Sequence, residues 1–194
     1  MNGYLVWRPG TKKDGICKLK GLTGVPKSFQ IDNGVSRLQG WPPEAAAAMN
    51  PDFPKDLGLA DSLDGANFLV ISGKAKQLIE QETAGKIEFL PMKIINHKGR
   101  LASDDYFVVN PLDIVDCIDK DASSVELDSL NTEMIDGCAQ LVLKEDVIPQ
   151  ELKIFRTKFW RGMILIRREL AQKMEKAGLT CMSFTEPTKY TGMF

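Results

Sequence analysis

EFLPMKIINHKGRLASDDYFVVNPLDIVDCID, residues 88–119, contains two apolar runs with a polar segment between them. In the first run, Phe89 to Ile95, apolar side chains fall on both sides of an extended chain, which predicts a strand covered on both faces. The second run is Tyr106 to Val109. The polar segment around Gly99 predicts the turn that joins the two runs.

Asn110-Pro111-Leu112-Asp113, directly after the second run, is typical of a helix start. Asn is a good N-cap, Pro fits the first helical position, and Asp complements the positive end of the helix dipole. Leu112, Val115 and Ile118 would then share one face of that helix. The stretch as a whole is therefore expected to form a strand–turn–helix packing unit.

The same stretch resembles the central region of an immunity-protein family from bacterial polymorphic toxin and type VI secretion systems. The matching elements are Leu90-Pro91-Met92, Gly99, Tyr106-Phe107-Val108-Val109, Asn110-Pro111-Leu112, Asp116 with Asp119, Ile154-Phe155-Arg156, and Gly178-Leu179-Thr180 with Phe184. The resemblance covers roughly residues 68–187 and departs at Cys181, where the family pattern has Gly. It implies a protein that binds and blocks a cognate toxin and catalyses no reaction itself.

The composition is that of one soluble domain, with 194 residues of which 43% are hydrophobic and 26% charged. A net charge of −1 argues against general binding to nucleic acid or to anionic membranes. No apolar run approaches the ~20 residues of a membrane-spanning helix. The N-terminal residues also lack the apolar segment and cleavage site of a signal peptide. We therefore expect a cytoplasmic protein with neither a nucleic-acid nor a membrane partner.

The four cysteines, Cys17, Cys117, Cys138 and Cys181, are scattered, and only one histidine accompanies them. Structural zinc sites cluster their ligands at short spacings, so we expect free thiols and no metal site. Gly73-Lys74 follows an apolar run but lacks the other residues of a phosphate-binding Walker loop. No cofactor is expected.

Residues 1–65 are rich in Gly and Pro, which predicts an irregular N-terminal lobe beside a main α+β domain of residues 66–194. Within this lobe, Tyr4 to Trp7 and Ser28 to Ile31 are expected to form short strands. Glu44 to Met49, an alanine run bracketed by prolines, is expected to form a helical turn or two. Whether the lobe is a separate subdomain stays open.

A weak internal repeat relates residues 68–81 to residues 163–176, at an offset of 95 positions. Each copy begins with a four-residue apolar run and continues with apolar residues at helical spacing. We expect Ser72 to be the N-cap of the first helix, and the two helices to end near Gly85 and Gly178. With a strand after each helix, the prediction is an α+β fold: a mixed β-sheet with helices packed on it, built from two strand–helix–strand units.

Residues 113–136 hold eight carboxylates and one lysine, a net charge of −7, whereas the last 44 residues have a net charge of +5. Clustered carboxylates speed the encounter with a basic protein and imitate a nucleic-acid backbone, as an inhibitor of a nuclease toxin would. The alternative interpretation is a solvated surface. The basic residues near the C-terminus are expected to face solvent or to pair with these acids: Arg167, Arg168, Lys173 and Lys176.

Aromatic residues contribute much of the binding energy of protein interfaces, and Trp160 falls in a predicted loop, although core packing is its simpler interpretation. The candidate toxin-binding residues are Asp116, Asp119, Asp121, Glu126, Asp128 and Trp160.

Two other functions remain open. A metal-dependent enzyme would use His97, the only histidine, with Asp104 and Asp105, because paired carboxylates bind hard cations. Adjacent residues of an extended chain point to opposite sides, however, which makes joint ligation awkward. An adaptor or chaperone would carry a secreted effector without neutralising it. Our first hypothesis is an immunity protein with a cognate toxin as its partner, and its oligomeric state stays open.

Overall fold

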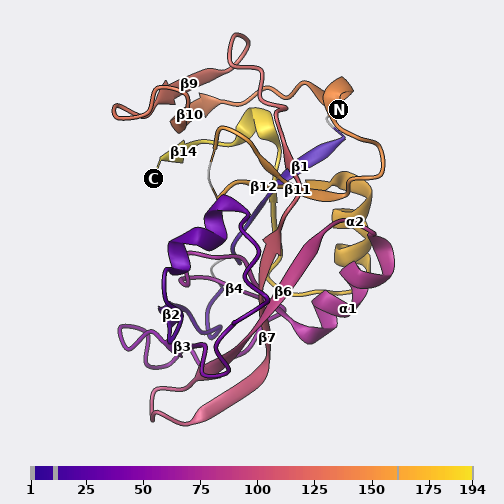
Figure 1. Cartoon of the computed structure of the whole chain (residues 1–194). Coiled ribbons are helices and arrows are strands. Elements are labelled where there is room, and N and C mark those ends of the chain that lie inside the picture. The colour runs from indigo at the N-terminus through magenta and orange to yellow at the C-terminus, as the bar shows by residue number, and fades with distance from the viewer. Residues whose placement is uncertain (1–2, 11–12, 161, 194) are drawn as a thin grey trace.

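The computed structural model describes residues 3–10, 13–160 and 162–193, and the statements below concern these residues. Their strands form three sheets, and the helices α1 and α2 lie side by side on one flank (Figure 1). The α+β class predicted from the sequence, a mixed β-sheet fold with helices packed on it, is confirmed. None of the helices in these residues has the length and apolar content to cross a membrane.

The largest sheet has six strands in the order β2-β3-β6-β7-β5-β4. Their bounds are β2 Leu19–Thr23, β3 Ala46–Met49, β4 Ser62–Leu63, β5 Val70–Ser72, β6 Ile87–Ile95 and β7 Leu101–Pro111. β6 and β7 pair antiparallel across the predicted turn, where Gly99 has a φ of 70°, in the left-handed region that favours glycine. The expectation that β6 is covered on both faces is wrong for its second half. Leu90 and Met92 are buried, whereas Pro91 and Lys93, which alternate with them along the strand, are exposed.

A second sheet has five strands in the order β13-β1-β12-β11-β8, and a third has the order β14-β10-β9. Their bounds are β1 Tyr4–Arg8, β8 Ile114–Val115, β9 Ser124–Leu127, β10 Ile135–Gln140, β11 Ile154–Thr157, β12 Ile164–Arg167, β13 Ser183–Thr185 and β14 Gly192–Met193. The predicted strand β1 is covered on both faces. Leu5 and Trp7 join a core with α1 and α2, whereas Tyr4 and Val6 join a core with β10.

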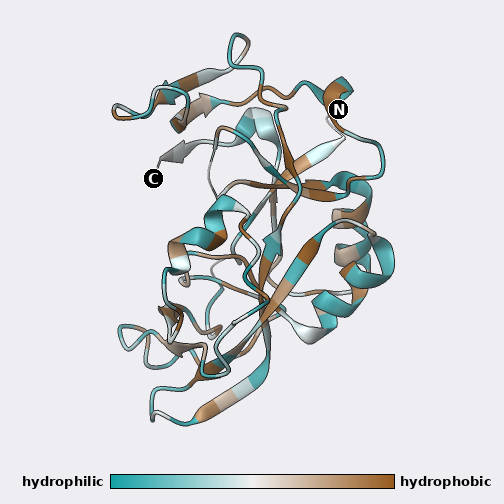
Figure 2. Ribbon diagram, viewed as in Figure 1, coloured by the Kyte–Doolittle hydropathy of each residue, from teal (hydrophilic) through white to brown (hydrophobic). Residues whose placement is uncertain are grey.

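Both helices connect strands that have a third strand between them in the sheet. α1, Gly73–Glu82, follows β5 and precedes β6, with β7 between these two strands. α2, Arg168–Lys176, follows β12 and precedes β13, with β1 between them. The helices turn buried residues such as Ile79 and Met174 inward, and Figure 2 shows α1 as largely hydrophilic beside the brown strands of the interior.

The helix ends agree only in part with the prediction. The Ser72 hydroxyl accepts a hydrogen bond from the backbone N–H of Ala75 at 3.3 Å and caps α1, as predicted. Gly178 has a φ of 70° just after α2, as a left-handed C-terminal cap requires. The expectation for Gly85 is wrong, because α1 ends earlier, at Glu82, and its C-cap residue Thr83 is extended.

Two expectations for the N-terminal residues are wrong. The alanine run predicted as helix is the strand β3, which lies between β2 and β6. Pairing on both edges overrides the helix propensity of alanine, and the fully buried Ala47 suits the close packing there. Ser28 to Ile31 belongs to a short 3-10 helix, η1, Ser28–Asn33. Since residues 1–65 supply strands to two sheets, the proposed boundary of an N-terminal lobe stays a prediction.

The predicted helix start at residues 110–113 is also wrong. β7 continues to Pro111, which pairs with Ile87 of β6. The N–H of Leu112 then donates to Lys86 O at 2.8 Å, and the C=O of Asp113 accepts from Arg156 N at 2.9 Å. These bonds between segments hold the chain extended into β8, where a helix would have satisfied the same groups locally.

The cysteines are free thiols, as expected, and three of the four are buried. Burial raises the pKa of Cys17 to about 11 and that of Cys117 to about 12, which keeps both protonated. Cys181, where the family pattern has Gly, has a φ of 58°. The turn therefore keeps the left-handed geometry of a glycine despite the side chain.

Candidate functional site

Two motifs that are far apart in the sequence meet where β7 and β11 end. Arg156 of β11 donates from Nε to Pro111 O at 3.2 Å and from Nη2 to Asn110 Oδ1 at 3.5 Å. Its side chain is only 3% exposed. Burial lowers the pKa of Arg156 to about 10, partly offset by the charge of Asp32. A buried guanidinium held by neutral acceptors is an unusual structural element and marks this position as a candidate site.

Asn110 extends this polar contact to Glu88, which is directly opposite it on the neighbouring strand β6. Its Nδ2 donates to Glu88 Oε2 and to Val35 O, both at 3.0 Å. Glu88 also accepts from the Ser36 hydroxyl and, at 2.8 Å, from Arg37 N. Burial alone would raise the pKa of Glu88, but these hydrogen bonds outweigh it and lower the pKa. The network ties the segment after η1 to the six-stranded sheet.

Asp32 of η1 is the carboxylate whose charge opposes the lowering of the Arg156 pKa, but among the described residues no ion pair joins the two groups. Burial raises the pKa of Asp32, and the attraction of Arg156 opposes that shift only in part. Asp32 and Arg156 therefore line the same region without forming an ion pair with each other.

That region is a cavity of about 660 Å³, a volume typical of ligand pockets. It lies at the ends of β1 and β11 and the start of β12, and η1, the segment before β5 and the turn between β9 and β10 complete its wall. Among its lining residues are Trp7, Phe29, Asp32, Asp128, Arg156 and Trp160. Arg156 and two predicted candidates, Asp128 and Trp160, are thus brought together here.

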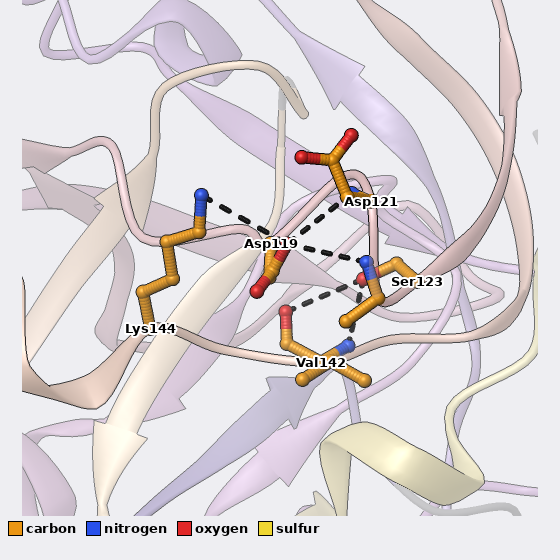
Figure 3. A network of polar contacts seen from close by, with 6 residues as sticks. Asp119, Asp121, Ser123, Val142 and Lys144 are labelled. Atoms are coloured by element: carbon orange, nitrogen blue, oxygen red, sulfur yellow. Dashed lines mark hydrogen bonds and ion pairs between the residues drawn. The ribbon is translucent and has the colours of Figure 1, made fainter.

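The other acidic candidates lie on the path from β8 into the β9–β10 hairpin. Asp119 Oδ1 accepts from the N–H groups of Asp121 and Ala122, both at 3.2 Å, and lies 3.8 Å from Lys144 Nζ (Figure 3). Asp116 lies 3.6 Å from Lys158 Nζ in an exposed ion pair. These two carboxylates therefore hold the loop and are partly neutralised within the chain.

Asp121 and Glu126 are exposed, and among the described residues no salt bridge engages their carboxylates. The hairpin beside them also exposes apolar groups, since Leu127 is 48% and Leu130 is 96% exposed. Asp128 closes the hairpin turn, where its Oδ1 accepts from Leu130 N at 2.7 Å. The hairpin thus presents carboxylates around an apolar tip, while the role of each residue in binding stays a prediction.

Trp160 is 1% exposed and packs edge-to-face on Tyr190, with ring centroids 5.5 Å apart. It contributes to the core and to the cavity wall and does not project from the surface. Its predicted contact with a partner would therefore have to occur inside the cavity.

The remaining family positions have structural surroundings that explain their residue types. Phe155 is fully buried and packs edge-to-face on Tyr4 at 5.4 Å. The Tyr106 hydroxyl donates to Ala60 O at 2.8 Å, and burial raises its pKa. Pro91 is exposed, and its C=O accepts from Trp41 Nε1 at 2.6 Å.

The residues of the enzyme hypothesis are not assembled. His97 lies in the β6–β7 turn, and Asp104 and Asp105 are exposed neighbours on β7. Within the described part of the chain, no hydrogen bond or ion pair joins His97 to either aspartate, and no group of His, Cys, Asp and Glu is arranged to hold a metal ion.

Two of the four basic residues singled out near the C-terminus have acidic partners outside residues 113–136. Lys173 Nζ contacts Glu82 of α1 at 2.6 Å, and Arg168 forms two hydrogen bonds with Glu186 at 2.7 and 2.8 Å. The prediction that these basic residues pair with acids is correct for Lys173 and Arg168, but their partners lie outside residues 113–136.

Sequence reasoning missed Glu88 and Asp32, whereas Trp7 was weighed as a possible interface residue with core packing as its simpler interpretation. Glu88 offered a signal, since it is the one carboxylate at the start of an otherwise apolar strand. Asp32 offered none, because only the folded chain brings it into the same cavity wall as Arg156.

Comparison with known proteins supports the resemblance on which the motifs rest. The profile of an immunity protein family (Imm11) matches residues 25–189. No curated protein matches the chain.

Proposed function

We propose that this chain, which belongs to the immunity protein family (Imm11), binds one cognate toxin and blocks its active site without catalysing a reaction itself. It would act in the cytoplasm of the bacterium that makes the toxin. The family match supports the general role, and the finer claims concern which surface binds and how.

The observation that carries the proposed surface is the β9–β10 hairpin. Leu130, at 96% exposure, has almost no contact with its own chain, yet it lies in the turn that Asp128 closes, just after the strand that carries the exposed Glu126. An apolar anchor within a charged rim is the usual anatomy of a protein interface. Carboxylates of one sign would steer a basic partner, such as a nuclease, toward that anchor.

Co-expression with the neighbouring toxin gene tests this proposal. Cells should survive with the wild-type chain, and the two proteins should copurify. Leu130→Asp should weaken binding about 30-fold, the equivalent of roughly 2 kcal/mol for a central interface residue, while the chain keeps its stability. Survival that is equally poor with and without the wild-type chain would contradict the proposal.

The charge contribution is tested separately. The double variant Asp121→Lys with Glu126→Lys should slow association and reduce its dependence on salt. Glu175→Lys is the matched control, because Glu175 is an exposed carboxylate on α2, away from the hairpin. If the control slows association as much as the double variant, the hairpin is not the steering surface.

A further inference from the structure

The wall of the cavity beside Arg156 includes two residues with buried donors that lack acceptors. Trp7 and Arg156 are each 3% exposed and line the cavity. Within the described residues, Trp7 Nε1 and Arg156 Nη1 have no hydrogen-bond partner. An unsatisfied buried donor is costly, so a group that supplies an acceptor here would be bound favourably.

Sheet register places both donors on the same face. Trp7 of β1 pairs with Ile164 of β12, and Arg156 of β11 pairs with the same Ile164. Residues directly opposite each other on neighbouring strands project to one side of a sheet. A single acceptor-bearing segment that enters at this end of the sheet therefore meets both side chains.

The charges around the cavity select against a strongly anionic occupant. Among the described residues, its wall includes the carboxylates of Asp32, Asp64, Asp128 and Asp136 and the two cations Arg8 and Arg156. A phosphate or a dicarboxylate would be repelled by this surplus. An occupant that combines an oxygen acceptor with a cationic group matches both features.

The rim extends beyond what a small molecule would cover. Phe29, which lines the cavity, is 64% exposed, and Leu130 lies between the lining residues Asp128 and Asn131. Apolar side chains on both sides of an opening fit a partner surface that continues outside it.

We propose that the cavity receives a basic segment of the toxin, whose carbonyl or carboxylate oxygen accepts from Arg156 and Trp7 while its Lys or Arg side chain pairs with Asp32 and the neighbouring carboxylates. This inference rests on the proposed function and names the part of the partner that is recognised. The hairpin then covers the toxin surface, and the cavity holds the inserted segment.

Trp7→Phe is the most selective variant, because it removes the donor and keeps most of the ring. The affinity for the purified product of the neighbouring toxin gene, measured by calorimetry, should fall about tenfold, the equivalent of one buried hydrogen bond. Because Trp7 is part of the core, the smaller ring should lower the melting temperature through lost packing, but not through a lost hydrogen bond, since Nε1 has no acceptor in the described residues of the free chain. Asp32→Asn, which removes one carboxylate charge, should weaken binding to a similar extent.

Trp41→Phe is the matched control. Trp41 Nε1 already donates to Pro91 O at 2.6 Å and lies outside the cavity wall. This variant should therefore melt at a lower temperature and bind the toxin with unchanged affinity. Weaker toxin binding by Trp7→Phe together with unchanged toxin binding by Trp41→Phe would separate a binding role from a structural one.

The outcomes distinguish this inference from the function on which it rests. If the wild-type chain does not bind the toxin, both fail. If Leu130→Asp loses binding while Trp7→Phe and Asp32→Asn bind like the wild type, the hairpin surface stands and the cavity inference is overturned. Native mass spectrometry that finds a small molecule in the wild-type chain but not in Trp7→Phe, with toxin affinity unchanged, would also overturn it.

Discussion

Replacing Glu88 by Gln tests the buried network that positions Arg156. Glu88 is 9% exposed and accepts three hydrogen bonds, from the Ser36 hydroxyl, Arg37 N and Asn110 Nδ2. Gln has nearly the same shape, so its oxygen can still face Arg37 and Asn110, and the Ser36 hydroxyl can rotate to accept from the new amide. The substitution therefore removes the charge and keeps the packing.

The magnitude follows from those three bonds. A hydrogen bond to a charged group contributes about 1 kcal/mol more than a neutral one, so three bonds lose about 3 kcal/mol. Burying a neutral amide is easier than burying a carboxylate, which returns about 1 kcal/mol. We expect the free energy of unfolding to fall by about 2 kcal/mol at neutral pH. For a domain of this size, the melting temperature should drop by about 4–8 °C.

Urea denaturation of the wild type, Glu88→Gln and the control Glu175→Gln measures this effect. The exposed control should lie within about 0.5 kcal/mol of the wild type. Because the folded state lowers the pKa of Glu88, its charge stabilises the fold above the ordinary Glu pKa of about 4.3, and this stabilisation is lost as the pH falls through the folded-state pKa. The difference between wild type and Glu88→Gln should therefore shrink in acid. Equal urea midpoints at neutral pH, or a difference that persists in acid, would refute the reasoning.

Three further outcomes are expected. Ser72→Ala removes the N-cap of α1 and should lower the free energy of unfolding by about 1 kcal/mol; an unchanged urea midpoint would count against the cap. Because Cys181 has a φ of 58°, Cys181→Gly should be more stable than Cys181→Ala by about 1 kcal/mol, and the reverse order would be inconsistent with a strained turn. The double variant His97→Ala with Asp104→Ala should protect cells like the wild type, whereas loss of protection would revive the enzyme hypothesis.

The parts of the fold that depend on local pattern could be predicted from the sequence. The cap at Ser72, the apolar spacing of both helices and the strand β1 all follow from neighbouring residues. The errors occur where pairing between distant segments determines the secondary structure. The alanine run of β3 has helix propensity but lies between two strands, and Asn110-Pro111 has the residues of a helix start but continues β7.

The candidate site, too, could be predicted from the sequence only in part. The acidic segment was visible as a charge bias along the chain, and the structure places it on and before the β9–β10 hairpin. The contact between Asn110 and Arg156 joins residues 46 positions apart, and no local pattern indicates it. The apolar tip at Leu130 was equally hidden, because a single leucine in a polar loop looks like any other.

Hydrogen–deuterium exchange of the chain with and without its purified toxin tests the central claim most directly. The amides of residues 121–136 are expected to exchange more slowly in the complex, because the hairpin would be covered by the toxin. Protection confined to α1 and α2, with exchange in the hairpin unchanged, would contradict the account.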